Sequence, residues 1–173
     1  SDSYAWALFI GWLNSLKVIL FGLLLSTLLG TLAGISRISR NIILHRLSAG
    51  YVALIRQIPL LLQLLFWYFV AFLSLSNTPL ELLGSLIQIS NQGLRFFGLD
   101  LSLEFTSLLI GLSIFTGASI AEVVRGGLNS VHKGQWEAYR SLGLTENIGM
   151  KEVVLPQALP AILPGLTSQY FNL

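Results

Sequence analysis

The stretch QWEAYRSLGLTENIGMKEVVLP, residues 135–156, is the one long polar passage in a chain that is otherwise mostly apolar. Of the 173 residues, 54% are hydrophobic and 10% are charged, whereas a soluble domain carries about 25% charged residues. The mean hydropathy is +0.74. We therefore expect the chain to lie in a lipid bilayer, with this stretch as a structured element outside the hydrocarbon.

Apolar runs predict about four membrane spans in an all-α, polytopic helical bundle, since a span needs roughly 20 residues. The runs cover residues 12–35, 51–75, 105–124 and 153–173. The last run could barely cross the bilayer, because its 18 residues from Pro156 onward reach only about 27 Å at roughly 1.5 Å per residue. By its length the chain, residues 1–173, is expected to be a single domain.

Small residues recur four apart in the first run, at Gly22, Ser26, Gly30 and Gly34. This spacing places them on one helical face, where a neighbouring helix can approach closely. We interpret the face as a helix-packing surface.

Basic residues predict which loops face the cytoplasm. The loop after the first run contains basic but no acidic side chains, and residues 125–151 are again rich in basic residues; the residues concerned are Arg37, Arg40, Arg46, Arg56, Arg125, Lys133, Arg140 and Lys151. Short loops with such an excess stay in the cytoplasm. The N-terminus is therefore expected outside, and the stretch 135–156 inside.

Residues 76–103 lack a basic excess, which suits the outer side of the membrane. Turn-forming residues punctuate the segment at Asn77, Pro79, Asn91, Gly93 and Gly98. The piece 80–89 between them is moderately apolar but too short to span. It is expected to form an interfacial helix.

Within the polar stretch, apolar residues recur at near-helical spacing at Trp136, Tyr139, Leu142 and Leu144. This predicts an amphipathic helix of about two turns, ended by the flexible backbone of Gly143. A second short helical segment is expected at 146–152. Such a helix either lies under the bilayer or docks on a partner.

The spacing of six residues in this stretch resembles the EAA loop of bacterial ABC-importer permeases; they are Glu137, Ala138, Gly143, Val153, Leu155 and Pro156. Tyr139 stands where a second Ala is usual, and its ring either fills a pocket on a partner or packs beneath the membrane. The passage AEVVRGG, with Glu122 and Arg125, resembles amino-acid permeases. These likenesses point to the polar amino-acid subgroup.

The resemblance implies a permease subunit of a bacterial inner-membrane importer, with residues 134–156 as the cytoplasmic EAA loop. The loop would contain a coupling helix, and the implied coupling residues are Glu137, Ala138, Tyr139, Gly143, Leu155 and Pro156. Implied partners are two ABC ATPase subunits, a second permease of the same or a related kind, and an external amino-acid-binding protein. Members of the family typically have five spans, so a longer natural protein is expected.

Three polar residues are candidates for the substrate path: Gln57, Gln63 and Glu122. Gln63 follows Pro59 by one turn, and it either hydrogen-bonds a neighbouring helix or lines the path. Glu122 and Arg125 are three apart, which suits an ion pair along one helix face. An ionisable group near a span is nevertheless a functional candidate.

The sequence contains no signature of catalysis. It lacks a Gly-x-x-x-x-Gly-Lys-Ser/Thr loop, so ATP and Mg²⁺ are expected on the partner ATPase and no cofactor on this chain. It has no Cys and no metal-ligand cluster, and the loop residues His45 and His132 are expected to be solvated. A net charge of +2 gives no reason to expect nucleic-acid binding. Two alternatives remain open: a self-contained secondary transporter or channel, and a structural membrane scaffold.

Overall fold

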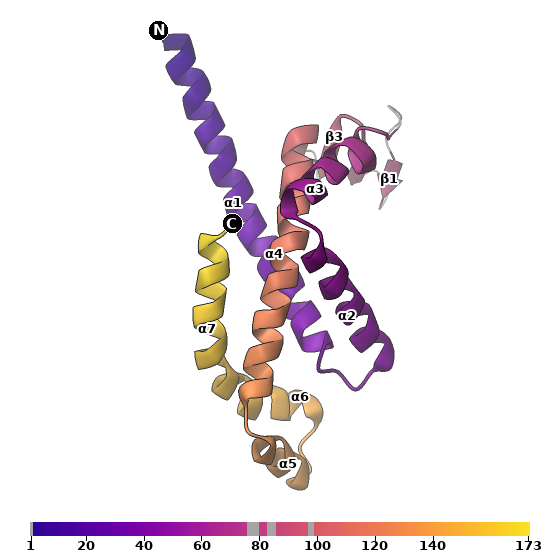
Figure 1. The fold of residues 1–173 in the computed structure, drawn as a ribbon, viewed down its shortest axis with the longest axis vertical. Coiled ribbons are helices and arrows are strands. Elements are labelled where there is room, and N and C mark those ends of the chain that lie inside the picture. Colours follow the sequence, from indigo (N-terminus) through magenta and orange to yellow (C-terminus); the bar gives the residue numbers. More distant parts are fainter. Residues whose placement is uncertain (1, 76–79, 83–85, 97–98) are drawn as a thin grey trace. The chain divides into compact units, whose positions relative to one another are not determined.

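A computed structural model describes residues 2–75, 80–82, 86–96 and 99–173 of a mostly helical chain (Figure 1). Contacts divide the chain into two compact units, each built from two separate segments. Unit 1 comprises Ser1–Leu25 and Gln57–Phe115, and unit 2 comprises Ser26–Arg56 and Thr116–Leu173.

Two helices in the described ranges are long and apolar enough to cross a membrane, α1 (Asp2–Ser36) and α4 (Leu103–Ser130). A broken pair gives a third candidate if it counts as one span; it joins α2 (Ile42–Gln57) to α3 (Leu60–Leu65) and the π-helical η1 (Phe66–Phe72). Helix α7 (Leu155–Phe171) has 17 residues, about 25 Å at roughly 1.5 Å each, and is shorter than a candidate span. The described residues therefore contain two or three candidate spans, where the sequence predicted about four.

The span predicted over residues 51–75 is not one straight helix, because the helix breaks at Pro59. Pro59 has no amide hydrogen and adopts φ −55° and ψ 139°, and a proline also keeps the preceding residue out of the helical region. The helix before the break, α2, begins at Ile42. Arg46 and Arg56 therefore lie on α2 rather than in a loop.

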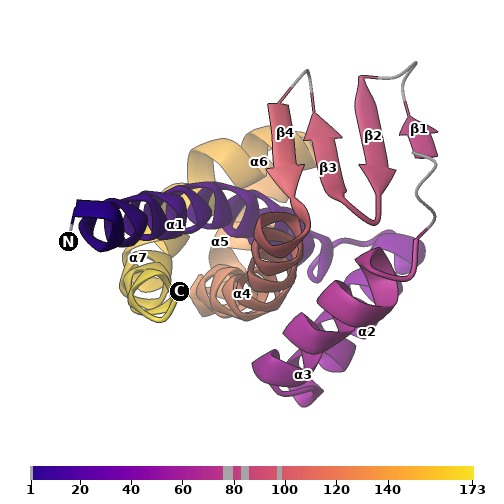
Figure 2. The same ribbon diagram turned by 90° about the horizontal axis from the view of Figure 1, so that it is seen from above.

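Four strands between residues 80 and 102 form an antiparallel sheet in unit 1, with the order β1-β2-β3-β4 (Figure 2). The strands are β1 (Leu80–Leu82), β2 (Ile87–Ser90), β3 (Gly93–Phe96) and β4 (Leu99–Ser102). The expected interfacial helix at 80–89 and the all-α class were therefore wrong. The physical reason is the alternation of apolar and polar residues, which has the period of a strand rather than a helix.

The turn between β2 and β3 depends on Gly93, which has a left-handed φ of 129°. An added Cβ at this position would collide with the carbonyl oxygen of Leu101 on β4. Only glycine combines this backbone conformation with such a close approach. Of the other predicted turn residues, Asn91 lies in this turn, whereas Asn77, Pro79 and Gly98 fall outside the described residues.

Unit 2 is held together by close packing of the end of α1 on α4. A Cβ at Gly30 would lie 2.6 Å from Ile120 Cβ, and a Cβ at Gly34 would lie 2.7 Å from Val124 Cβ. The small residues predicted from the sequence therefore do allow a neighbouring helix to approach, as expected for membrane helices.

Four helical segments follow α4 in unit 2. They are α5 (Lys133–Ser141), α6 (Glu146–Gly149), the π-helical η2 (Met150–Val154) and α7, and Figure 1 labels three of them, α5, α6 and α7. The prediction of two short helical segments separated at Gly143 is confirmed. The second segment continues through η2 into α7, so the polar stretch is connected directly to the last helix.

Candidate functional site

Helix α5 has fixed ends. At its start, the ring nitrogen Nδ1 of His132 accepts a hydrogen bond from a first-turn amide at 3.1 Å. At its end, Gly143 has a left-handed φ of 72°, and the amides of Gly143 and Leu144 donate to the carbonyls of Arg140 and Tyr139. This bond pair is the Schellman arrangement, which terminates a helix at glycine. The length of α5 is therefore set by its own sequence.

Tyr139 lies on the inner face of α5 and is 1% exposed. A Cβ added at Gly149 would lie 2.2 Å from Cδ2 of the Tyr139 ring, so the ring occupies the space that a side chain at 149 would need. The Tyr139 hydroxyl donates a hydrogen bond to Oε2 of Glu146 at 2.5 Å. Burial raises the pKa of the Tyr139 phenol, and the bond to Glu146 raises it further. The ring thus packs inside the chain itself, which is neither of the two sequence-based alternatives, a pocket on a partner or packing beneath the membrane.

The Glu146 carboxylate contacts three side chains from different parts of unit 2. Besides Tyr139, it accepts a hydrogen bond from Arg140 Nε at 3.0 Å and pairs with Arg40 at 3.4 Å. The bond from Arg140 is the main cause that lowers the pKa of the Glu146 carboxyl, followed by the bond from Tyr139. Because Arg40 lies in the connection between α1 and α2, this carboxylate joins α5 and α6 to that connection.

The opposite face of α5 is exposed. It carries Glu137, Ala138, Ser141 and Leu142, and the Leu142 side chain is 77% exposed. Within the described part of the chain, Glu137 makes no side-chain hydrogen bond or ion pair. With an exposed leucine beside an unpaired carboxylate, this face has no partner among the residues that the structure describes.

The inner face of α5 belongs to one apolar core. Tyr139 packs there with residues of α4, η2 and α7, and the buried members of the core are Ile120, Val124, Leu128, Val131, Tyr139, Val154, Ala158 and Ile162. Close packing transmits displacement, since protein interiors have low compressibility. A force on α5 would therefore reach α4 and α7 through this core.

Residues 26–173 match the family described as "Binding-protein-dependent transport system inner membrane component". The chain belongs to this family. The match covers every element of unit 2, including α5 and its exposed face. The protein is thus an inner membrane component with several helical spans.

Named relatives of this inner membrane component are amino-acid permeases. It is 32% identical to the General L-amino acid transport system permease protein AapQ of Rhizobium johnstonii over 255 residues, covering 100% of this chain and 64% of that protein. It is 35% identical to the probable glutamine ABC transporter permease protein GlnM of Bacillus subtilis over 163 residues, covering 94% of this chain and 64% of that protein. The chain thus spans about two thirds, 64%, of the length of these relatives.

Two solved structures share the fold of this inner membrane component. One is the crystal structure of an amino acid ABC transporter with histidines, with a TM-score of 0.68 and 28% identity over 98% of this chain and 69% of that one. The other is an inward-facing MetNI methionine ABC transporter, with a TM-score of 0.62 and 21% identity over 99% of this chain and 72% of that one. The second likeness concerns the fold alone.

Of the remaining residues of the EAA-like spacing, Val153 lies in η2, and Leu155 and Pro156 lie at the start of α7. Leu155 is partly buried and packs against the apolar core, and Pro156 is exposed in the first turn. A proline is tolerated there because the first helical amides have no partner inside the helix. Both residues therefore lie where the polar stretch joins α7.

Glu122 on α4 carries an ion pair at each carboxylate oxygen. Arg125 donates to Oε2 at 2.8 Å, as the spacing of three predicted, and Arg37 donates to Oε1 at 2.6 Å. The second partner comes from the end of α1 and was not predicted. Glu122 therefore joins α1 to α4 within unit 2.

The other two path candidates flank the break at Pro59 in unit 1. Gln57 is exposed at the end of α2. Gln63 is 4% exposed and donates from Nε2 to the Ile58 carbonyl at 2.9 Å. That carbonyl lies beside the proline, which cannot supply a backbone donor, so Gln63 stabilises the break.

Sequence reasoning missed Arg37, Arg40, Glu146 and Gly149 as members of the site. The three charged residues form ion pairs with residues far along the chain, and Gly149 leaves room for the Tyr139 ring. Neither kind of contact can be recognised from the order of residues in the sequence. The one available signal was the large residue Tyr139 in a position where the family usually has Ala, because a larger ring needs a compensating small residue.

Proposed function

We propose that the chain is the transmembrane permease subunit of an ATP-driven amino-acid importer. It would form a single transmembrane domain that provides the translocation path and couples it to a partner ATPase through residues 134–156. The observation that supports this best is α5, which is fixed on one side by Tyr139 and presents Glu137 and Leu142 on the other. The relatives named above, a general L-amino acid permease and a probable glutamine permease, support an amino-acid substrate.

In this proposal α5 is the coupling helix, and its exposed face docks on the ATPase. Glu137, Ala138 and Leu142 would contact the partner, while Gly143 fixes where the helix ends. Closure of two ATPase subunits on ATP would displace α5. The displacement would reach α4 and α7 through the core around Tyr139 and the junction at Leu155 and Pro156, and would alternate access to the path.

A second route for the displacement runs through Glu146. Arg40 pairs with this carboxylate, and it lies in the short connection between α1 and α2. Glu122 then ties the end of α1 to α4 through Arg37. The two ion-pair sites would make α1, α4 and α5 move together, so we assign Glu146 and Glu122 positioning roles in coupling.

The proposed topology places the N-terminus outside and the EAA loop in the cytoplasm of a bacterial cell, with α7 as part of a fourth span. Two ABC ATPase subunits would bind ATP and Mg²⁺. A second permease subunit and an external amino-acid-binding protein complete the proposed complex. Gln57, Gln63 and, in addition to its positioning role, Glu122 remain the proposed path residues.

The test of this function separates an importer from a secondary transporter. Proteoliposomes with the complete complex and the binding protein should take up a labelled amino acid only when ATP and functional ATPase subunits are present. The panel should contain acidic, neutral and basic amino acids, since the substrate class is part of the proposal. Uptake driven by an ion gradient without the ATPase would instead identify a self-contained secondary transporter.

A further inference from the structure

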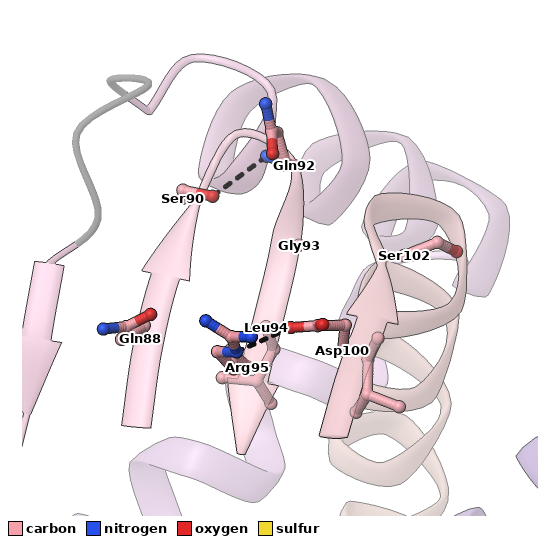
Figure 3. Close-up of a pocket in the computed structure, with 9 residues that line it drawn as sticks. Gln88, Ser90, Gln92, Gly93, Leu94, Arg95, Asp100 and Ser102 are labelled. Atoms are coloured by element: carbon pink, nitrogen blue, oxygen red, sulfur yellow. Dashed lines mark hydrogen bonds and ion pairs between the residues drawn. The ribbon is translucent and has the colours of Figure 1, made fainter. Parts of the chain in front are cut away.

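The four-stranded sheet of unit 1 has one polar face. Glu81, Gln88, Arg95 and Asp100 lie opposite one another across the four strands. Gln88 donates to Glu81 at 3.4 Å, and Arg95 pairs with Asp100 at 2.9 Å. Figure 3 shows Gln88, Arg95 and Asp100 in line across β2, β3 and β4, among the residues that line a cavity of about 550 Å³.

The same face also carries Ser90 on β2, Gly93 on β3 and Ser102 on β4, each two positions from the polar residue already named on its strand. Successive residues of a strand point to opposite faces. The described members of this face are therefore all polar or glycine, which is the composition of a surface in contact with water.

The opposite face of the sheet is apolar. By the same register, its residues with described side chains are Leu80, Ile87, Ile89, Leu94, Phe96 and Leu101. Leu80 is 59% exposed and Phe96 is 42% exposed. Among the described residues, the strands contact mainly one another. An apolar sheet face needs a covering layer to be stable.

The connections of the sheet indicate what covers this face. Strand β4 ends at Ser102 and the candidate span α4 begins at Leu103, so no linker separates the sheet from a membrane helix. At the other end, β1 begins at Leu80, only a few residues after η1 ends at Phe72. Both ends of the sheet thus lie only a few residues along the chain from candidate membrane helices.

A sheet with open edges cannot enter the hydrocarbon core, because its edge amides and carbonyls would lose their hydrogen-bonding partners. At the interface, water can satisfy the edges of β1 and β4 while the apolar face meets lipid. An amphipathic helix lies in the interface for the same reason. In the sheet, apolar and polar residues alternate with a period of two, whereas in an amphipathic helix the period is 3.6.

We propose that residues 80–102 form an interfacial amphipathic sheet that lies flat on the phospholipid surface where α4 begins. Its apolar face enters the boundary between headgroups and acyl chains, and its polar face, with Arg95 and Asp100, points to water. The inference goes beyond the proposed function, because it assigns a lipid partner to a segment that the coupling mechanism does not use.

The test uses neighbouring residues that the register places on opposite faces. The chain has no cysteine, so in a complex whose other subunits are made cysteine-free, the single substitutions Gln88→Cys, Ile89→Cys, Leu94→Cys and Arg95→Cys each place one fluorescent bimane label on each copy of this chain. The complete complex is reconstituted in phosphatidylethanolamine and phosphatidylglycerol vesicles, and quenching is measured with brominated lipid and with aqueous iodide.

Labels at positions 89 and 94 should be quenched at least twofold more by brominated lipid than labels at 88 and 95, with the order reversed for iodide. Protection of 89 and 94 from both quenchers would overturn the proposal, because protein would then cover the apolar face. Equal iodide quenching at all four positions would overturn it as well.

A measurement on the unsubstituted complex guards against labels that disturb the sheet. Vesicles containing a phospholipid with a diazirine in its acyl chain are irradiated, and adducts are located by mass spectrometry. Adducts are expected on the apolar-face residues and not on Gln88, Arg95 or Asp100. An absence of adducts throughout residues 80–102, while α1 is labelled, would contradict the proposal.

Discussion

The ring of Tyr139 fills the space beside Gly149: a Cβ at position 149 would lie 2.2 Å from ring atom Cδ2 and 2.3 Å from Cε2. The pair explains how this chain accommodates a tyrosine in the loop position where related permeases are expected to have alanine. The ring anchors α5 to the helical segment that leads into α7. The large residue and the glycine therefore function as a unit.

Substitution of Gly149 by Ala should destabilise unit 2, because the added methyl group overlaps a buried ring. Overpacking of this kind costs about 1–3 kcal/mol. The melting temperature of the purified complex in detergent should fall for Gly149→Ala, and the fall should be much smaller when Tyr139→Ala is already present. Additive effects of the two substitutions would show that the residues do not share one space.

The ion pairs of Glu146 predict a pH dependence. Because the pKa of Glu146 is lowered in the folded state, the carboxylate contributes stability above the ordinary value of 4.5, and this contribution is lost as the pH falls through the lower folded value. Thermal unfolding between pH 6 and pH 3 should show a smaller acid-induced loss in Glu146→Gln than in the unsubstituted chain. Identical pH profiles would contradict the assignment.

Glu122 should contribute more to stability than either of its partners. Glu122→Gln removes both ion pairs at once and leaves Arg37, at 19% side-chain exposure, without its carboxylate. Loss of one member of a largely buried ion pair costs about 3 kcal/mol. The melting temperature should fall more for Glu122→Gln than for Arg125→Gln.

The same substitutions separate a positioning role of Glu122 from a substrate-binding role. If Glu122 only positions α1 against α4, Arg37→Gln and Glu122→Gln should change uptake in the same way for every amino acid. A rise in KM for one class of amino acid with Glu122→Gln alone would instead identify Glu122 as a ligand.

Gly30 should tolerate no larger residue, because its missing side chain lets α1 reach Ile120 on α4. Gly30→Leu is expected to prevent formation of a stable complex, measured as the monodisperse fraction in size-exclusion chromatography. Gly50→Leu on α2 is the matched control, since no atom lies within 4 Å of a Cβ built there. Normal yield of the Gly30 variant would show that the two helices do not pack at this point.

The sequence predicted those features that depend on local patterns. The helix ended by Gly143, the small-residue face of α1 and the Glu122–Arg125 pair all arise from residues within a few positions of one another. The sheet was also readable in principle, because Leu94, Arg95 and Phe96 alternate in polarity, but a hydropathy average over the segment conceals a period of two.

Other features could not be obtained from the sequence. The pairs Arg37–Glu122 and Arg40–Glu146 join residues that are far apart in the chain, and many basic residues could have been their partners. A proline inside a helix can either bend it slightly or break it. At Pro59, packing and the Gln63 hydrogen bond decide between the two, and the proline alone does not.

The central claim is that the exposed face of α5 receives the movement of the ATPase, and the ratio of amino acid transported to ATP hydrolysed tests it most directly. This ratio is measured in proteoliposomes for Glu137→Lys and for Glu152→Lys, which makes the same charge change at an exposed position outside α5. We predict that Glu137→Lys lowers the ratio at least fivefold in an assembled complex while Glu152→Lys leaves it unchanged. An unchanged ratio for Glu137→Lys, with complex assembly intact, would contradict the account.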